Sequence, residues 1–184
     1  NLSGWFVPAK KSNKSVLICH GIGANKSNFI TSIDFLVFAG YNVLIFDFRG
    51  HGESDGHTCS VGYWEKLDVE AAYNYLKQQN YEIHGIGYSM GAAALLNFAS
   101  ENSDSKAKFK TIILDSPFDT LPNIAESQLY FLPSFLKKTG ANLMLRFASV
   151  VIWGNPWSVD NTKWIKQIKT NVLIFHGDSD SIIP

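Results

Sequence analysis

Short apolar runs alternate with segments of helical periodicity along most of the chain. Most of the runs are rich in Val and Ile and are apolar at consecutive positions. A parallel strand that is covered by helices on both sides needs this pattern, and the alternation predicts βαβ units around a mostly parallel sheet. We expect six strands, at Gly4–Val7, Val16–Cys19, Val43–Phe48, Ile83–Tyr88, Thr111–Leu114 and Val172–Phe175.

Three helical segments are expected between these strands. The first ends at Gly40, a residue type that commonly ends helices. The third, Gly91–Ala99, is apolar on nearly all sides, so we expect it to be buried at the centre of the molecule. The apolar positions that define the first two are Phe29, Ile33, Leu36 and Val37, and Leu67, Ala71, Ala72, Tyr75 and Leu76.

Residues 117–169 form a long insertion between the fifth and sixth predicted strands. This segment is partly helical in pattern and is broken by Pro122, Pro133 and Pro156. We expect it to form a lid of short helices rather than a second domain. Residues 1–184 are therefore expected to make one domain.

Composition excludes several classes of protein. With 46% apolar and 17% charged residues, the 184-residue chain matches an ordinary globular domain rather than a disordered one. Sixteen basic and sixteen acidic residues give no net charge, so the balance does not indicate a nucleic-acid partner. No apolar run reaches about 18 residues, so no membrane-spanning segment is expected. Cys19 and Cys59 fit neither a disulfide framework nor a metal site, and we expect free thiols.

The chain begins at Asn1 and shows no charged segment followed by an apolar one. Any targeting or anchoring segment is therefore expected to lie outside it. Contact with a membrane through such an anchor, the cellular compartment and the oligomeric state all stay open at this point.

The clearest chemical signal is Gly87-Tyr-Ser-Met-Gly91, at the junction between a predicted strand and the buried helix. A serine on such a tight turn is raised above the sheet, and the glycines are needed because a Cβ would collide with the neighbouring chain. The turn predicts Ser89 as a nucleophile. It also directs the Met90 N–H toward the point where a tetrahedral intermediate develops negative charge. The alternative is a glycine-flanked turn whose serine has no function.

The sequence His20-Gly21-Ile22-Gly23 follows the second predicted strand directly. A loop at this position can offer a second backbone donor, the Ile22 N–H, to the same oxyanion, and an acyl-transfer site needs two such donors. The alternatives are a plain glycine-rich turn and a phosphate-binding loop, although the GxGxxG and Walker patterns are missing.

Turn residues follow the third predicted strand, and here we expect structure rather than catalysis. Asp47 and Arg49 can hold the turn through local hydrogen bonds and an ion pair. His51 is expected to be a loop histidine rather than a base. Glu65 and Asp68 open the next helix, where acidic side chains favour the positive end of the helix dipole.

The sequence His176-Gly-Asp-Ser-Asp180 leaves the sixth predicted strand at the edge where the sites of open α/β sheets lie. An acid there can orient and charge-stabilise a histidine base. Asp180 and Asp178 compete for this role. The spacing after His-Gly favours Asp180, and Asp178 is better placed to support the turn.

Together these motifs resemble those of the α/β-hydrolase superfamily, and the likeness runs nearly from end to end. Its signatures, each after a strand of the family's sheet, are His20-Gly21, Asp47 to Ser54, Gly87 to Gly91, Asp115 to Phe118 and His176 to Pro184. Gly4 to Pro8, Gly62, Glu65 and Asp68 are most similar to the Bem46-type and serine-aminopeptidase-like branch. The resemblance implies Ser89 as nucleophile, Asp180 as triad acid, and Ile22 and Met90 as the backbone donors of an oxyanion hole.

The histidines depart from the superfamily's pattern. The family's order along the chain is nucleophile, acid, histidine, yet all five histidines precede Asp180. A strand, a crossover helix and the next strand take about 30 residues, so we expect the base to belong to a final unit outside these residues. The chain is accordingly expected to be a hydrolase without its C-terminal unit.

The implied activity is that of a serine hydrolase that cleaves a carboxylic ester or thioester through an acyl-serine. Its partner would be a small-molecule acyl substrate, with no metal or organic cofactor. A peptidase or an acyltransferase would use the same groups, and a non-catalytic binding domain could keep the fold. The insertion's apolar side chains either cover an acyl chain or pack on the body; they are Leu129, Tyr130, Phe131, Leu132, Phe135, Leu143, Met144, Leu145, Phe147 and Trp153.

Overall fold

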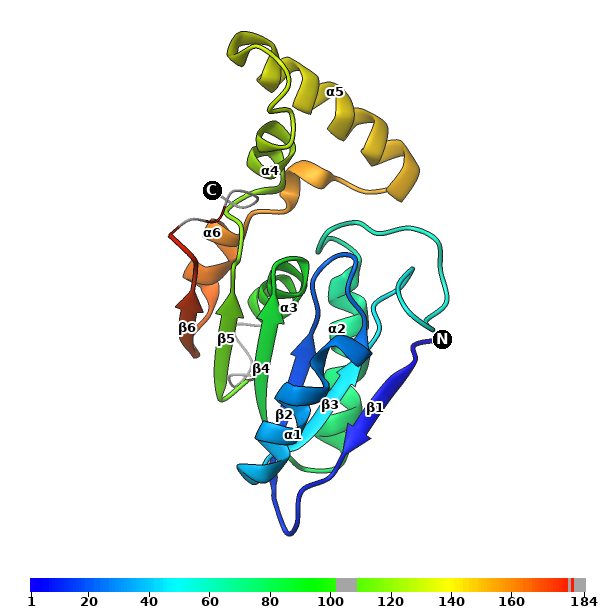
Figure 1. The fold of residues 1–184 in the computed structure, drawn as a ribbon, viewed down its shortest axis with the longest axis vertical. Helices are drawn as coiled ribbons and strands as arrows, with labels where there is room; N and C mark the ends of the chain where they lie inside the picture. The colour runs from blue at the N-terminus through cyan, green and yellow to red at the C-terminus, as the bar shows by residue number, and fades with distance from the viewer. Residues whose placement is uncertain (102–108, 179, 181–184) are drawn as a thin grey trace.

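The computed structural model describes residues 1–101, 109–178 and 180. Within them, six strands form one sheet in the order β1-β3-β2-β4-β5-β6 (Figure 1). Strand β1 runs antiparallel to β3, and the other neighbouring pairs are parallel. The six predicted strands are confirmed with small shifts at their ends, as β1 Gly4–Val7, β2 Lys14–Cys19, β3 Asn42–Phe46, β4 Glu82–Tyr88, β5 Thr111–Asp115 and β6 Asn171–Phe175.

Helices cover both faces of the central strands, as continuous apolar runs require. Helix α1 (Ile30–Phe38), which follows the 3-10 turn η1 (Lys26–Phe29), packs Ile33 on one face. Helices α2 (Glu65–Gln78) and α3 (Met90–Ser100) pack on the opposite face (Figure 1). Every residue of α3 is buried, so the prediction of a central buried helix is confirmed.

The predicted apolar face of α2 is wrong in part. Leu67 and Tyr75 are 42% and 45% exposed, and Ala71 is exposed as well. The helix is turned because two of its carboxylates, on Glu65 and Asp68, are buried against the preceding loop. The side chains that α2 buries are therefore Glu65, Asp68, Val69, Ala72, Tyr73 and Leu76.

The insertion between β5 and β6 lies beyond the carboxyl ends of the parallel strands (Figure 1). Its two ends are tied together, because the Leu121 N–H donates to the Val159 carbonyl (3.0 Å) and the Asn161 N–H to the Asp119 carbonyl (2.9 Å). The prediction of short helices is wrong for α5, which has 19 residues. The elements are α4 (Leu121–Ser127), α5 (Ser134–Ile152), η2 (Pro156–Ser158), α6 (Asn161–Trp164) and η3 (Ile165–Gln167).

Few of the ten apolar side chains named above for the insertion are buried. Leu145 is buried beside Phe118 and Val159, and Leu129 packs against the same cluster. Seven others are exposed, namely Tyr130, Phe131, Phe135, Leu143, Met144, Phe147 and Trp153. None of the described helices combines the length and the apolar character needed to cross a membrane.

Strand β6 is the outermost strand on its side of the sheet. Its Leu173, Ile174 and Phe175 side chains are 49%, 48% and 55% exposed. Within the described residues, this edge of the sheet is therefore both unpaired and apolar.

Candidate active site

Ser89 joins β4 to α3 in a strained backbone conformation. Its φ is 46° and its ψ is −111°, a region that residues other than glycine rarely adopt. The Ser89 N–H donates to the Asp115 carbonyl of β5 (2.9 Å), and the Ser89 carbonyl accepts from the Ala93 N–H (3.2 Å). Such strain costs on the order of 1–3 kcal/mol and persists where the surrounding structure holds it. The strand-to-helix turn predicted around Ser89 is thus present.

The glycines on either side of Ser89 are required by close packing. A Cβ on Gly91 would overlap the carbonyl of Cys19 in β2, and one on Gly87 would lie 2.6 Å from Ala92 Cα. These are contacts with backbone atoms, which cannot move aside as a flexible side chain would. The collision predicted from the motif is therefore observed, and it holds the start of α3 against β2 and β4.

The two residues predicted to supply oxyanion donors belong to segments that meet at Ser89. Met90 is the first residue of α3, and the first N–H groups of a helix have no partner within it. Gly21 lies beside the serine, since a Cβ built on Gly21 would be 3.6 Å from Ser89 Cβ. Ile22 follows Gly21 in the same loop, and its side chain is 57% exposed. The structure thus brings the loop after β2 next to the turn after β4.

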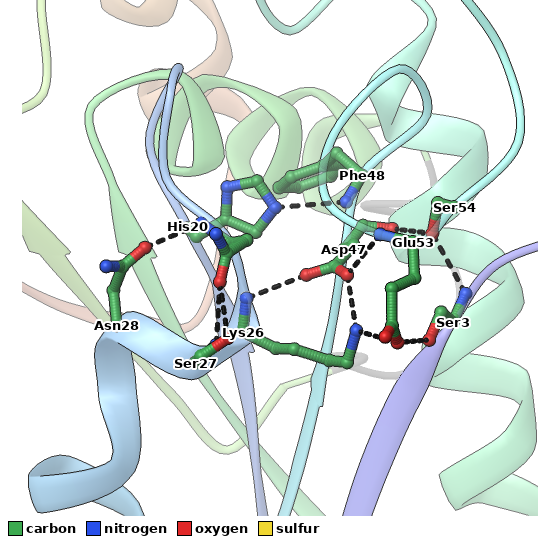
Figure 2. A network of polar contacts seen from close by, with 10 residues as sticks. Ser3, His20, Lys26, Ser27, Asn28, Asp47, Phe48, Glu53 and Ser54 are labelled. Carbon is green, nitrogen blue, oxygen red and sulfur yellow. Dashed lines mark hydrogen bonds and ion pairs between the residues drawn. The ribbon is translucent and has the colours of Figure 1, made fainter.

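His20 holds the peptide that carries the Ile22 N–H. The His20 side chain is fully buried, and its Nε2 accepts from the Phe48 N–H (3.0 Å; Figure 2). Nδ1 then carries the hydrogen and donates to the Gly21 carbonyl (2.7 Å). The peptide is planar and trans, so the Ile22 N–H points away from that carbonyl. Burial lowers the pKa of His20, which favours the neutral ring.

A buried ionic network anchors the other end of this loop (Figure 2). The Asp47 carboxylate, fully buried, accepts from the Lys26 N–H (2.7 Å), the Glu53 N–H (2.9 Å) and Lys26 Nζ (2.5 Å). Lys26 Nζ also donates to Glu53 Oε2 (2.8 Å) and lies 5.5 Å from the centre of the Trp5 ring. The ion pair expected between Asp47 and Arg49 is a wrong prediction, because Lys26 is the cation that reaches Asp47.

Hydrogen bonds keep Asp47 and Lys26 in their charged forms, although burial disfavours those forms. Burial alone would raise the pKa of Asp47, but the bonds from Glu53 and Lys26 outweigh it and the pKa is lowered. Burial would likewise lower the pKa of Lys26, and its bonds to Asp47 and Glu53 raise it. Both groups are therefore charged at neutral pH.

Two carboxylates of α2 hold the loop that follows β3. Asp68 binds the Arg49 guanidinium (Nη2 to Oδ1, 2.6 Å) and the Arg49 N–H (3.1 Å). Glu65 accepts from the Ser60 N–H (2.7 Å) and hydroxyl (2.6 Å) and from the Gly62 N–H (2.8 Å). The expectation that these acids act mainly through the helix dipole is corrected: each is buried and bound to specific loop groups.

His51 lies in this loop, as expected. Its Nδ1 is 3.0 Å from the Arg49 carbonyl, and its ring centre is 5.2 Å from that of His20. These contacts attach His51 to the turn that the Asp47 network stabilises.

The acid-bearing loop leaves the same edge of the sheet as Ser89. Tyr88, Asp115 and Phe175 are register partners on β4, β5 and β6. Neighbouring strands are about 4.8 Å apart, so the chain after Phe175 leaves the sheet about 10 Å from Ser89, with β5 between them. The Asp180 N–H donates to the Gly177 carbonyl (3.1 Å). Ser179 and residues 181–184, which complete the predicted motif, lie outside the described residues.

An apolar cavity of about 490 Å³ opens beside this loop. Ile174 and His176 from the end of β6, Leu96 of α3 and Asn161 of α6 contribute to its wall. Asn161 Nδ2 donates to the Phe118 carbonyl (2.7 Å), while its buried Oδ1 has no partner within the described residues. Asp119, Thr162 and Lys166 also line this cavity, so polar groups interrupt its mainly apolar wall.

Both cysteines are free thiols, as predicted. Burial raises the pKa of Cys59 to about 12 and also raises that of Cys19, so neither is a thiolate at neutral pH. Over the part of the chain that the structure describes, no three His, Cys, Asp or Glu side chains gather in a way that could hold a metal ion.

A strained serine at the carboxyl edge of a mainly parallel sheet, with helices on both faces and the loop after β2 beside it, defines a protein of the α/β-hydrolase class. Residues 14–151 match the family model described as the alpha/beta hydrolase fold, and the chain belongs to this family.

Similar proteins agree with this membership. The uncharacterized protein YqkD of Bacillus subtilis (strain 168) is 30% identical over 190 residues, covering 100% of this chain and 61% of that protein. The lysophosphatidylserine lipase ABHD12 of Danio rerio is 26% identical over 194 residues, covering 98% of this chain and 47% of that protein. A structure of the Pyrococcus furiosus esterase Pf2001 is similar with a TM-score of 0.73 at 29% identity, covering 99% and 67%.

The chain spans between 58% and 61% of the length of the first three curated relatives. Its fold is that of hydrolases, since solved structures that share it include esterases.

Proposed function

We propose that the protein is a serine hydrolase that cleaves a carboxylic ester or thioester through an acyl-serine intermediate. The observation that carries the proposal is Ser89 at φ 46°, held by glycine contacts and placed beside the loop of Gly21 and Ile22. A serine without function would not need this strained turn, which costs stability.

The proposed chemistry follows from the groups around the serine. Ser89 Oγ attacks the acyl carbon and its proton passes to a histidine, while the Met90 and Ile22 N–H groups bind the negative oxygen of the tetrahedral intermediate. The histidine returns the proton to the leaving alcohol or thiol, and an acyl-serine remains. Water then repeats the sequence and releases the acid. Asp180 would orient the histidine and stabilise its charge.

We propose that this histidine lies outside these residues. The family's order places it after the acid, and both ring nitrogens of His20 are already hydrogen-bonded. A serine without a base is a weak nucleophile near neutral pH, so the 184-residue chain should hydrolyse esters poorly. The longer protein, meaning these residues together with the segment that supplies the histidine, should be fully active.

The relatives support an acyl ester as the bond that is cleaved. One similar structure is that of an esterase, and one relative is a lysophosphatidylserine lipase. The helical insertion stands beyond the strand ends where Ser89 lies, and we propose that it acts as the lid of the acyl site.

Hydrolysis of a p-nitrophenyl ester by the longer protein tests the nucleophile. Ser89→Ala should abolish turnover without changing the fold. Ser116→Ala is the matched control, because Ser116 is also a serine at positive φ (48°) directly after a neighbouring parallel strand. Its variant should keep wild-type activity. Turnover that survives Ser89→Ala would place the nucleophile elsewhere.

The same assay on the 184-residue chain tests the source of the base. We expect residual activity only. A fully active 184-residue chain would show that one of its own histidines is the base, with His51 and His176 the first to replace.

A further inference from the structure

Helix α5 has a second apolar face that the described residues leave uncovered. Its inner face places Ala141 and Leu145 in the cluster beneath the insertion, where each is 3% exposed. On the opposite side, Leu143, Phe147 and Val150 are 70%, 73% and 73% exposed. A helix at the surface of a globular protein normally shows polar residues there.

The uncovered residues form one continuous strip. At about 100° per residue, Val150, Leu143, Leu136, Phe147, Val151 and Met144 follow one another around about 120° of the helix. All six are exposed. We call them the outer apolar face of α5: Leu136, Leu143, Met144, Phe147, Val150 and Val151.

Exposed aromatic residues lie at both ends of this face. Tyr130, Phe131 and Phe135 precede it or begin the helix and are 80%, 69% and 78% exposed, and Trp153 follows the helix and is 87% exposed. Monomeric soluble proteins rarely leave so many neighbouring apolar side chains in water, and such patches commonly mark an interaction surface.

The charge of the segment is of one sign. Residues 127–159 contain Lys137, Lys138 and Arg146 and no acidic residue, although the whole chain has equal numbers of acidic and basic residues. Basic residues combined with aromatic and aliphatic side chains on an exposed helix are typical of segments that lie in the interface of an anionic lipid surface. Two copies of this helix would bring like charges together, which disfavours pairing with itself.

We propose that the outer apolar face of α5 docks on the surface of an anionic phospholipid bilayer, with the helix lying along the surface rather than crossing it. The apolar strip would enter the boundary between headgroups and acyl chains, and Lys137 and Arg146, which flank the strip on its two sides, would contact the phosphates. The insertion stands at the carboxyl ends of the strands (Figure 1), so docking would turn this edge of the sheet toward the lipid.

Vesicle flotation tests the proposal, because aggregated protein does not float with the lipid. The vesicles are ether-linked phosphatidylcholine with or without ether-linked phosphatidylserine. Their hydrocarbon chains are not held by ester bonds, so an esterase cannot release them. The Ser89→Ala form of the longer protein is used throughout, since docking does not involve the serine. Failure of the proposed hydrolase activity would therefore leave this result unaffected.

We expect the protein to float with phosphatidylserine vesicles and to bind phosphatidylcholine vesicles far less. Phe147→Glu or Val150→Glu should weaken binding by about tenfold or more, since each removes apolar area and adds a repelled charge. Arg146→Gln should weaken it by about fivefold, the share of one basic residue near an anionic surface. Phe38→Glu is the matched control, because Phe38 of α1 is 93% exposed and lies outside the insertion. It should bind as the unsubstituted form does.

Three results would overturn the proposal. One is equal binding to vesicles with and without phosphatidylserine. Another is equal loss of binding in the Phe38 and Phe147 variants. The third is a stable dimer in light scattering that Phe147→Glu dissociates, which would make the outer apolar face a contact between two copies.

Discussion

Replacing Lys26 with Met tests the buried network that holds the loop after β2. The Lys26 and Asp47 side chains are 4% and 0% exposed, and Nζ lies 2.5 Å from Oδ2. Removing one partner of a buried ion pair costs about 3–5 kcal/mol, because the other charge stays buried. Asp47 keeps two backbone donors in the variant, so we expect the lower end, about 3 kcal/mol.

Urea denaturation measures this loss. For a chain of this size the free energy of unfolding falls by about 2–3 kcal/mol for each molar urea, so Lys26→Met should move the midpoint by about 1–1.5 M. Glu53→Gln is the control, because its side chain also binds Lys26 Nζ but is 76% exposed. It should produce a much smaller shift.

The free energy of unfolding that Lys26→Met loses should depend on pH. The pKa of Asp47 lies below its ordinary value of 3.8, so its charge stabilises the fold above that pH and the contribution is lost as the pH falls through the folded-state pKa. The pKa of Lys26 is raised above 10.5, so its contribution is complete below that pH and is lost at higher pH. The difference in the free energy of unfolding between wild type and Lys26→Met should therefore be largest between pH 3.8 and pH 10.5 and should become smaller outside this range.

A small effect of Lys26→Met would contradict the burial of the Lys26–Asp47 pair. A loss below about 1 kcal/mol, the range of surface ion pairs, would mean that the pair is not buried as described. If Lys26→Met lowered the free energy of unfolding by the same amount at pH 3 and at pH 7, the loss would not depend on the charge of Asp47.

Three further predictions concern the acid, His20 and the sheet edge. In steady-state assays of the longer protein, Asp180→Asn should lower ester turnover about 10⁴-fold, as loss of a triad acid does. Asp178→Asn should lower it much less. The reverse ranking would exchange the roles of the two acids. The pKa of His20 is lowered from 6.5, so the free energy of unfolding should fall as the pH drops below 6.5, and urea titrations of His20→Asn should show a weaker fall. The 184-residue chain should self-associate through β6, and Leu173→Lys should reduce the mass found by light scattering.

The fold was predictable because its signals are local. A buried parallel strand needs consecutive apolar residues, and β2 and β3 carry them. The turn at Ser89 was predictable for the same reason, since its five residues contain both the strained position and the glycines that packing demands.

Other features depend on partners distant in sequence. Lys26 meets Asp47 across 21 residues and Asp68 meets Arg49 across 19, and nothing at these positions alone identifies the partner. The buried face of α2 was misassigned for the same reason. The spacing of its apolar residues gave no sign that Glu65 and Asp68 lie inward. The length of α5 was missed because Pro133 precedes the helix rather than breaking it.

The proposed function depends on Ser89 as the residue that forms the covalent intermediate. Treating the longer protein with a fluorophosphonate and mapping the adduct by mass spectrometry tests it most directly, since only an activated serine reacts rapidly. We expect one adduct, on Ser89, and none in Ser89→Ala. An adduct on another residue, or ester turnover with Ser89 unmodified, would contradict it.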